Sequence, residues 1–225
     1  MLTLCYSPGT CALSDLIVLA LVGKPYQLCR VSREERTGEL YKRVNPRGQV
    51  PALVTEYGVL TENAAILLKI ADAAPEAGLV PALGTPERDR LHEWLSYLDS
   101  GFHVAFYPIF KPSIFSDDPS HAALLAETAK KRVAEHYRHI DAKLAGRAYV
   151  LGDRYTVLDP YLVAMGRWGR SFLDLADVAP NVDALLTRLQ ARPEVVFGLA
   201  VERGEIESDA RFGLVGHVPL RDLAA

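Results

Sequence analysis

A loop bounded by two prolines runs directly into an extended segment at Asn45-Pro46-Arg47-Gly48-Gln49-Val50-Pro51-Ala52-Leu53. Two prolines and a glycine within six residues fix a loop, and Pro51 begins a strand. The Val50–Pro51 bond is a candidate cis peptide, because cis bonds are almost confined to X–Pro. A cis bond would turn the backbone of Val50 outward to pair with an extended peptide ligand. An ordinary trans-proline at the start of a strand is an equal alternative.

Strand and helix signals alternate on both sides of this loop. Period-two segments predict strands, and apolar residues three and four positions apart predict helices. The predicted strands are Leu2–Tyr6, Tyr26–Val31, Pro51–Thr55 and Gly58–Leu60, and the predicted helices are Cys11–Val22 and Glu62–Ala73. The resulting order, β-α-β-(α)-β-β-α, predicts an α+β domain over residues 1–74.

Prolines and glycines then crowd into residues 75–86, which predicts a linker. Every readable segment after it has helical period, which predicts an all-α domain over residues 87–203. Its helices are expected at 87–111, bent at Pro108, and at 120–144, 157–172, 182–192 and 194–203. Residues 204–225 have no clear period, but they carry apolar side chains that a disordered tail would seldom have. We expect this tail to fold back over the helical domain and partly close a pocket.

Composition excludes several classes of partner. The 225 residues are 49% hydrophobic and carry a net charge of −3, whereas nucleic acid or an anionic membrane demands clustered excess lysine and arginine. The longest apolar run, Leu16–Val22, is far shorter than the roughly 20 residues of a membrane span, and the first residues lack the features of a secretory signal. Three cysteines make neither a disulfide framework nor a metal-ligand spacing. These features predict a cytoplasmic protein with no metal site.

Cys11 follows a strand and a tight Ser7-Pro8-Gly9 turn, on the first turn of a predicted helix. Free backbone N–H groups and the helix dipole favour an anion there, so we expect a lowered thiol pKa and a reactive thiolate. The alternative is a small buried hydrophobic residue, which is the usual role of a free cysteine. Cys5 and Cys29 lie within predicted strands and are expected in the core.

A third segment with chemical potential is Leu60-Thr61-Glu62-Asn63-Ala64, where a hairpin strand runs into a helix. The N-terminus of a helix can hold a ligand carboxylate, and Glu62 can bind an ammonium group. Together they suit the amino-acid end of a small zwitterion. The alternative is a helix cap with an acidic residue in its first turn.

Two further groups are open to a structural interpretation. Thr156 and Asp159 have the spacing of a capping box and are expected to stabilise a helix rather than to act in catalysis. Seven aromatic and aliphatic residues recur at helical spacing, which favours core packing, although some of them would suit an apolar co-substrate pocket. This aromatic group comprises Phe102, Phe106, Tyr107, Phe110, Ile114, Phe115 and Trp168.

In this order and spacing, the motifs resemble the glutathione S-transferase superfamily, and the bacterial beta class in particular. The resemblance spans residues 1 to about 203. It is carried by Tyr6-Ser7-Pro8-Gly9-x-Cys11-x-Leu13-Ser14, Asn45-Pro46-x-Gly48-Gln49-Val50-Pro51-Ala52-Leu53, Thr61-Glu62, Glu93-Trp94-Leu95-x-Tyr97, His103-x-x-Phe106-x-Pro108-x-Phe110, Gly152-Asp153-Arg154-Tyr155-Thr156-Val157-x-Asp159-x-Tyr161-Leu162 and Ala191-Arg192-Pro193-Glu194-Val195. It implies an α+β thioredoxin-like N-terminal domain, an all-α C-terminal domain and a homodimer.

The resemblance also implies roles for individual residues. Cys11 would face the sulfur of glutathione, with His103 nearby and with Tyr6 as the rival activating group. The remaining implied contacts to glutathione are Arg36, Val50, Pro51, Glu62, Asn63, Ser96 and Ser100. The chain departs from the class at Val104, where the best-known members have lysine, at Asn63, where a small residue is more usual, and in its tail. With Val104 in place of lysine, His103 is expected to be the only titrating cation near the sulfur.

The implied function is a glutathione-dependent transferase with glutathione as co-substrate. It would conjugate glutathione to a small hydrophobic electrophile, exchange thiol and disulfide through Cys11, or use glutathione in dehalogenation or isomerisation. The alternative from another class is a non-catalytic binding or regulatory protein of the same fold. A Cys11–glutathione mixed disulfide and a Cys11 thiol hydrogen-bonded to the glutathione thiolate both remain open, because two adjacent thiolates repel each other.

Overall fold

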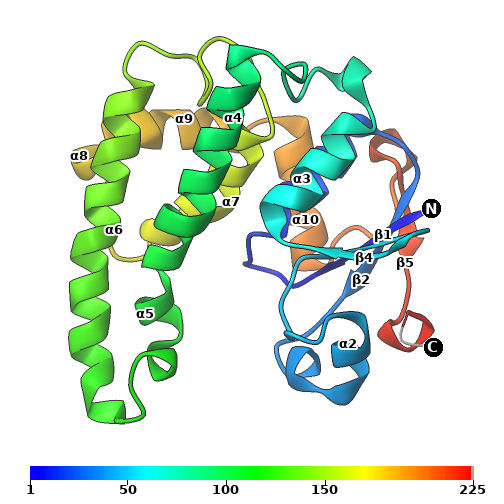
Figure 1. The fold of residues 1–225 in the computed structure, drawn as a ribbon, viewed down its shortest axis with the longest axis horizontal. Helices are drawn as coiled ribbons and strands as arrows, with labels where there is room; N and C mark the ends of the chain where they lie inside the picture. The colour runs from blue at the N-terminus through cyan, green and yellow to red at the C-terminus, as the bar shows by residue number, and fades with distance from the viewer. Residues whose placement is uncertain (224–225) are drawn as a thin grey trace.

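In the computed structural model, which describes residues 1–223, a sheet-containing domain lies beside a helical domain (Figure 1). The sheet has five strands in the order β4-β3-β1-β2-β5. Their bounds are β1 Leu2–Tyr6, β2 Tyr26–Arg30, β3 Ala52–Thr55, β4 Gly58–Thr61 and β5 Leu214–His217. Strand β1 is parallel to β2 and antiparallel to β3, and β3 and β4 form the predicted hairpin.

Helices cover both faces of this sheet. The first three are α1 (Leu13–Val22), α2 (Glu39–Val44) and α3 (Asn63–Asp72). Helices α1 and α3 pack against each other in the main core, while α2 covers a smaller cluster that includes Cys5 and Cys29. The predicted core positions of those two cysteines are therefore confirmed, as is the thioredoxin-like α+β arrangement.

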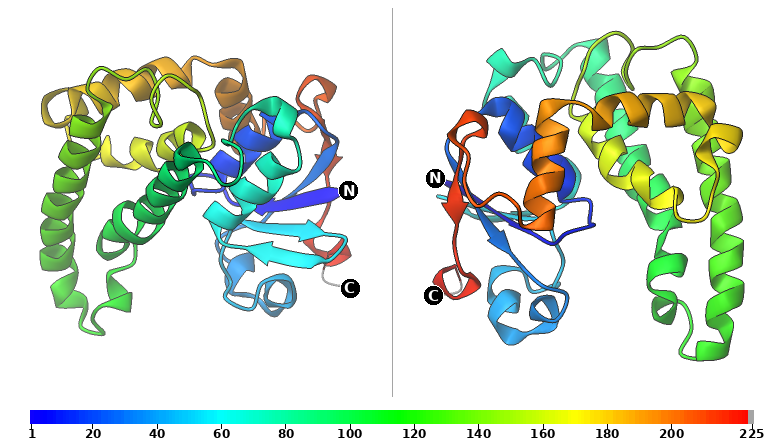
Figure 2. Two further views of the ribbon diagram at one scale, coloured as in Figure 1. Left: turned by 45° about the horizontal axis from the view of Figure 1, so that its top comes forward. Right: turned by 180° about the vertical axis from the view of Figure 1, so that it is seen from behind.

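The helical domain is built from α4 (Pro86–Tyr97), α5 (Tyr107–Phe110), α6 (Ala122–Leu144), α7 (Leu158–Gly169), α8 (Leu175–Val178), α9 (Pro180–Gln190) and α10 (Pro193–Arg203). Helix α10 crosses back to the sheet domain and packs against α1 (Figure 2). An ideal Cβ built on Gly198 would lie 3.0–3.2 Å from side-chain atoms of Leu13, Ile17 and Leu16. The absence of a side chain at this position lets the two helices approach closely, and their contact joins the two domains.

The single helix predicted over residues 87–111 is interrupted. Helix α4 ends at Tyr97, residues 98–103 wind as a π-helix, and the short α5 begins at Tyr107. Pro108 therefore lies in the first turn of a new helix, where its missing N–H breaks no hydrogen bond, instead of bending a continuous one. The break places His103 at the end of the π-helical turn, a location often associated with functional sites.

The capping interaction before α7 is confirmed. The Asp159 carboxylate accepts hydrogen bonds from the N–H groups of Thr156, at 2.8 Å, and Val150, at 3.0 Å. Its burial is complete, which raises the pKa of Asp159 to about 6, although these N–H donors oppose the shift. The residue is structural, as expected.

The prediction for the tail is wrong. Residues 214–217 form β5, which pairs in parallel with β2 at the edge of the sheet, on the side of the sheet domain away from the helical domain (Figure 1). The ring of Phe212 stacks on Phe197 of α10 at 4.4 Å between ring centroids, and Leu220 packs in the Cys5 cluster. The tail thus pairs the free edge of β2, which would otherwise expose unpaired backbone groups. Within residues 1–223 no helix is both long and apolar enough to cross a membrane.

Candidate active site

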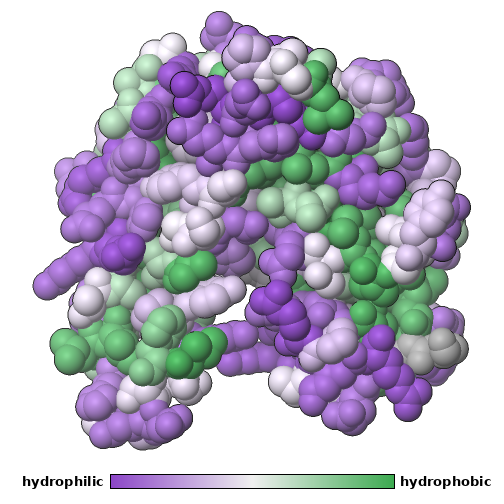
Figure 3. Space-filling model, viewed as in Figure 1, coloured by the Kyte–Doolittle hydropathy of each residue, from purple (hydrophilic) through white to green (hydrophobic). Residues whose placement is uncertain are grey.

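A cavity of about 890 Å³ lies between the two domains. In Figure 3 hydrophobic residues gather on the helical side of this hollow and hydrophilic residues on the sheet-domain side. Ligand sites for small molecules commonly have about 300–1,000 Å³, so this volume is at the upper end of the range. The predicted site residues that line it are Cys11, Arg36, Val50, Pro51, Glu62, Asn63, Ser100 and His103. Within residues 1–223, no group of three or more histidine, cysteine and carboxylate side chains is arranged to hold a metal ion.

The turn between β1 and α1 forms one wall and is held by the helical domain. The N–H of Gly9 donates to Glu202 Oε1 at 2.9 Å, and the indole Nε1 of Trp168 donates to the Gly9 carbonyl at 2.9 Å. Arg167 forms an ion pair with Glu202 at 2.7 Å and also donates to the Thr10 carbonyl at 3.3 Å. Residues more than 150 positions away in the sequence therefore fix the loop that presents Cys11.

Cys11 lines the cavity, but the expected lowering of its thiol pKa is wrong. Only 4% of Cys11 is exposed, and burial raises the pKa of its thiol above the ordinary value. The carboxylates of Asp15 and Asp99 raise it further, while the backbone N–H groups of Cys11 and Ala12 oppose the shift. The helix N-terminus acts in the expected direction, but desolvation of the thiolate outweighs it. At neutral pH Cys11 is a protonated thiol.

The Val50–Pro51 peptide bond is cis, so the first of the two interpretations of this loop is confirmed. The loop is held by the carbonyl of Gln49, which accepts hydrogen bonds from Asn45 Nδ2 at 2.7 Å and from the Tyr41 hydroxyl at 2.8 Å. Both donors come from α2 or the residue directly after it. The local network fixes Val50 at the edge of the cavity.

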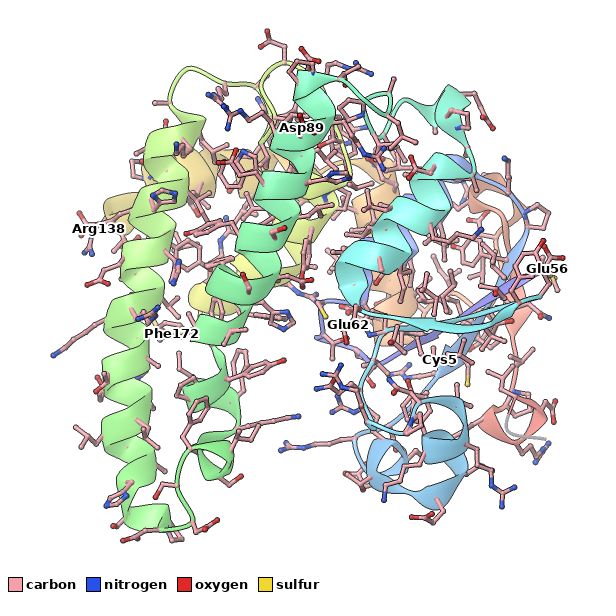
Figure 4. All side chains as sticks on the ribbon, viewed as in Figure 1. Cys5, Glu56, Glu62, Asp89, Arg138 and Phe172 are labelled. Carbon is pink, nitrogen blue, oxygen red and sulfur yellow. The ribbon has the colours of Figure 1, made fainter. Side chains whose placement is uncertain are left out.

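Glu62 precedes α3, Asn63 is its first residue, and both line the cavity. Glu62 has φ of 71°, an unusual value for a residue with a side chain, and its carboxylate forms an ion pair with Arg47 at 2.5 Å. Asn63 is buried and donates to the hydroxyl of Ser14 at 2.9 Å, while its Oδ1 atom is buried with no hydrogen-bond partner within residues 1–223. This amide oxygen is available to a donor from a ligand. Figure 4 shows Glu62 at the end of the sheet domain that faces the helical domain.

Arg36 is half-buried in the cavity wall, and its Nε atom is buried with no hydrogen-bond partner in the part of the chain that the structure describes. Its backbone lies against the cis-proline loop. An ideal Cβ on Gly48, whose φ is 64°, would come within 2.5 Å of the Arg36 carbonyl oxygen. Glycine at position 48 therefore permits both the left-handed conformation and the close approach.

His103 enters the cavity from the helical domain. Its ring lies 5.3 Å from Trp168 and 5.6 Å from Tyr107 between ring centroids. Burial lowers the pKa of His103 below its usual 6.5, and Asp99 opposes this shift. The imidazole is thus neutral at pH 7, and the expectation that it is a titrating cation near the sulfur is wrong because desolvation disfavours its charged form. It can still donate one N–H. Val104 is exposed at the rim.

Two predicted residues lie outside the cavity. Tyr6 is buried, and its hydroxyl contacts His217 Nε2 of the tail at 3.2 Å. Burial raises the pKa of Tyr6 to about 12, so neither its position nor its acidity suits activation of a thiol in the cavity. Ser96 is exposed on α4 and does not line the cavity of its own chain, whereas Ser100 does, with its hydroxyl donating to the Ser96 carbonyl at 2.7 Å.

The aromatic group divides between the two interpretations. Phe102 and Phe106 are fully buried in the core, while Tyr107, Phe110 and Trp168 line the cavity. Ile114 and Phe115 are exposed and outside the cavity wall.

Several residues of the site were not identified from sequence. Arg47 and Gln49 lie inside the quoted loop motif, so a closer interpretation of that motif would have found them. Asp99 lies four residues before His103 on the same helical segment, a spacing that places both on one face. Arg167 and Glu202 carry no local signal, because their role depends on how the two domains pack.

Comparison with known proteins agrees with this geometry. Two family models match, "Glutathione S-transferase, N-terminal domain" over residues 11–73 and "Glutathione S-transferase, C-terminal domain" over residues 97–193. Glutathione S-transferase GST-4.5 of Xanthomonas campestris pv. campestris is 33% identical over 196 residues, which cover 87% of this chain and 96% of the relative. Glutathione S-transferase GstA of Escherichia coli O157:H7 is 31% identical over 201 residues, with 88% and 96% coverage.

Solved structures give the same result. A sphingomonad glutathione S-transferase complexed with glutathione has a TM-score of 0.81 at 37% identity, covering 89% of this chain and 98% of that one. A bacterial beta class glutathione S-transferase from Sphingomonas chungbukensis has a TM-score of 0.79 at 38% identity, covering 91% and 100%. Both domains match in order, and relatives above 30% identity span nearly the whole length, so this chain belongs to the glutathione S-transferase family and is similar to its beta class.

Proposed function

We propose that this chain is an enzyme that conjugates glutathione to a small electrophile in the cavity between its domains. The observation that carries the proposal is the convergence, on one cavity, of a cis-proline loop, the start of α3 and a cysteine thiol. A non-catalytic binding protein has no need to keep this set together. Glutathione is the co-substrate, consistent with the solved relatives that hold it.

We place the γ-glutamyl end of glutathione at the start of α3. Its carboxylate would meet the free N–H groups of the helix, and its ammonium group would meet Glu62 and the unpartnered Oδ1 of Asn63. The cysteinyl backbone would pair with Val50 beside the cis bond. The glycine carboxylate would bind the guanidinium of Arg36, which lines the cavity and whose Nε is a buried donor.

In this placement the sulfur of glutathione faces Cys11. Because burial favours the protonated form of Cys11, its S–H would donate a hydrogen bond to the glutathione thiolate, and the neutral His103 would add a second N–H donor. Of the two alternatives left open by the sequence, this is the one that the buried thiol supports. The glutathione thiolate then attacks the electrophile, and Cys11 keeps its proton throughout.

The binding mode is tested by replacing single glutamates of the protein with glutamine. Glu62→Gln should weaken glutathione binding about five- to tenfold in calorimetry, since a charge-assisted hydrogen bond is lost. Glu56→Gln is the matched control, because Glu56 is exposed at the far tip of the β3–β4 hairpin (Figure 4). Equal affinity of both variants for glutathione would contradict this placement.

The sulfur chemistry is tested by comparing Cys11→Ala with Tyr6→Phe in two assays. Cys11→Ala should lower the rate of conjugation by about ten- to a hundredfold through loss of the donor to the thiolate. Tyr6→Phe should change only stability. Reduction of a glutathione mixed disulfide that persists in the wild type and disappears in Cys11→Ala would instead assign thiol–disulfide exchange to Cys11. Full conjugation in Cys11→Ala would exclude its role.

We further propose that two copies associate, with the sheet domain of one chain against the helical domain of the other. Ser96 lies outside the cavity of its own chain, and a second hollow of about 320 Å³ lies near it, between α4 and α6. Equilibrium sedimentation at micromolar concentration should give twice the chain mass of 24.7 kDa. A single species at 24.7 kDa would contradict the association.

A further inference from the structure

The cavity carries more positive than negative side chains, although the whole chain has a net charge of −3. Its wall contains Arg33, Arg36, Arg47 and Lys111, against the carboxylates of only Glu62 and Asp99. A hollow with an excess of positive charge, in a chain of negative net charge, attracts anionic ligands.

Most of these charges already have a partner or a proposed one. Arg47 forms an ion pair with Glu62, and the Asp99 carboxylate accepts a hydrogen bond from the Tyr161 hydroxyl. Arg36 is the proposed partner of the glycine carboxylate of glutathione. Two cations remain, Arg33 and Lys111, and within residues 1–223 neither of them forms an ion pair.

Lys111 directly follows the aromatic wall of the cavity. The ring of Phe110 lies edge-on to Trp168 at 5.4 Å between centroids and stacks on the buried Phe106 at 5.7 Å. Phe110, Trp168 and Tyr107 thereby offer aromatic faces and edges to a planar ligand, on which stacking and edge contacts are favourable. Arg33 comes from the other domain, in the loop after β2, where Ser32 and Glu35 fix its backbone by reciprocal hydrogen bonds of 2.7 and 3.1 Å.

We propose that the second substrate is an aromatic electrophile that carries a carboxylate or a similar fixed anion, with its ring on the aromatic wall and its anion bound by Lys111 and Arg33. This inference rests on the proposed function and adds the charge of the substrate to it. Glutathione itself does not account for these two cations, because its own two carboxylates are placed at α3 and at Arg36.

Two probes separate the ring from the charge. 1-Chloro-2,4-dinitrobenzene is neutral, and 4-chloro-3,5-dinitrobenzoate adds a carboxylate to an activated chloroarene. In both reactions the glutathione thiol first loses its proton to solvent. The thiolate then forms a C–S bond to the carbon that holds chlorine, the C–Cl bond breaks, and chloride leaves with the bonding electrons. The measured quantity is the ratio of kcat/KM for the anionic probe to that for the neutral probe, each corrected for the uncatalysed reaction.

Lys111→Met and Arg33→Met should each lower this ratio about five- to tenfold, since each removes one charge-assisted contact at a partly exposed site. Lys143→Met, which removes an exposed lysine on α6 outside the cavity, should leave the ratio at its wild-type value. Raising the ionic strength from about 0.02 M to about 0.5 M should lower the wild-type ratio as well, because salt screens exposed charges.

An unchanged ratio in both cavity variants would overturn the inference. If kcat/KM fell by the same factor with both probes, the ratio would also be unchanged, and Lys111 or Arg33 would then act on glutathione rather than on the electrophile. If the wild type bound glutathione but turned over neither probe, the proposed transferase function would itself fail. If the wild type turned over both probes and neither Lys111→Met nor Arg33→Met changed the ratio, the inference would fail while the proposed transferase function would stand.

Discussion

The tail strand β5 offers a sharp test of what residues 204–223 do. Leu214 begins this strand and is 1% exposed in the main core, while the next residue, Val215, is 54% exposed on the opposite face. The two positions share a strand and have similar aliphatic side chains. Val215 lies at an irregularity of the ladder, where Tyr26 and Gln27 of β2 pair with Leu214 and Gly216. Leu214→Ala and Val215→Ala therefore differ mainly in whether a buried side chain is removed.

The structure sets the size of the expected effect. Replacing a buried leucine with alanine costs about 2–5 kcal/mol of unfolding free energy, and an edge strand that can relax belongs in the lower half of that range. We expect about 2–3.5 kcal/mol for Leu214→Ala and less than about 1 kcal/mol for Val215→Ala. For a chain of this size, one kcal/mol shifts Tm by about 2–4 °C, so Leu214→Ala should lower Tm by about 4–14 °C.

Thermal unfolding of both variants measures this difference, and steady-state kinetics on the folded proteins separates stability from a role in the pocket. KM for the electrophile should be unchanged in both variants, because none of residues 204–223 lines the cavity. Equal Tm values for Leu214→Ala and Val215→Ala would refute the packing of β5. A raised KM with normal Tm would instead restore the tail as a lid over the cavity.

Three further predictions concern the framework of the site. Gly198→Ala should cost about 1–3 kcal/mol of unfolding free energy, because the added methyl group crowds α1. Val196→Ala, at an exposed position on α10, is the control and should cost less than about 1 kcal/mol. Equal urea midpoints for the two variants would contradict the close contact. Asp159→Ala should cost about 2–4 kcal/mol of unfolding free energy, because it leaves the buried N–H groups of Val150 and Thr156 unpaired. A Tm within about 2 °C of wild type, which corresponds to roughly 1 kcal/mol, would contradict its capping role. His103→Gln should flatten the dependence of stability on pH below about 6.5. The folded state lowers the pKa of His103, so the unfolded chain binds the proton first and wild-type stability falls as pH falls through that window, by up to about 1.4 kcal/mol per pH unit; parallel curves for the two proteins would refute the assignment.

Features that depend on nearby residues were predictable from the sequence. Helical spacing located α1, α3, α6, α7, α9 and α10, and the hairpin followed from a short turn between period-two segments. The capping role of Asp159 required only its spacing from Thr156. The family resemblance then gathered Cys11, Val50 and Glu62 into one site, although their own motifs left an alternative open for each of them.

Features that depend on packing between distant segments were not predictable. The sign of the Cys11 pKa shift follows from burial, to which Asp15 on the same helix and then Asp99, almost 90 residues away, add. Strand β5 forms only because the edge of β2 is free, and apolar residues without period do not indicate which edge they will meet. The family resemblance makes Tyr6 a rival activating group, but its hydroxyl contacts His217 of the tail.

The same dependence on packing bears on how the thiol is controlled. The turn that carries Cys11 belongs to the sheet domain, yet its Gly9 N–H and Thr10 carbonyl are bound by Glu202 and Arg167 of the helical domain. Glu202 is 7% exposed and paired with Arg167, and removing one partner of such a buried pair typically costs about 3–5 kcal/mol because the other charge is left unpaired. The exposure of Cys11 is thus coupled to the docking of α7 and α10 on the turn. Loosening that contact would admit water to the thiol. Since desolvation is the largest cause of the raised pKa of Cys11, the size of that shift depends on both domains being in place.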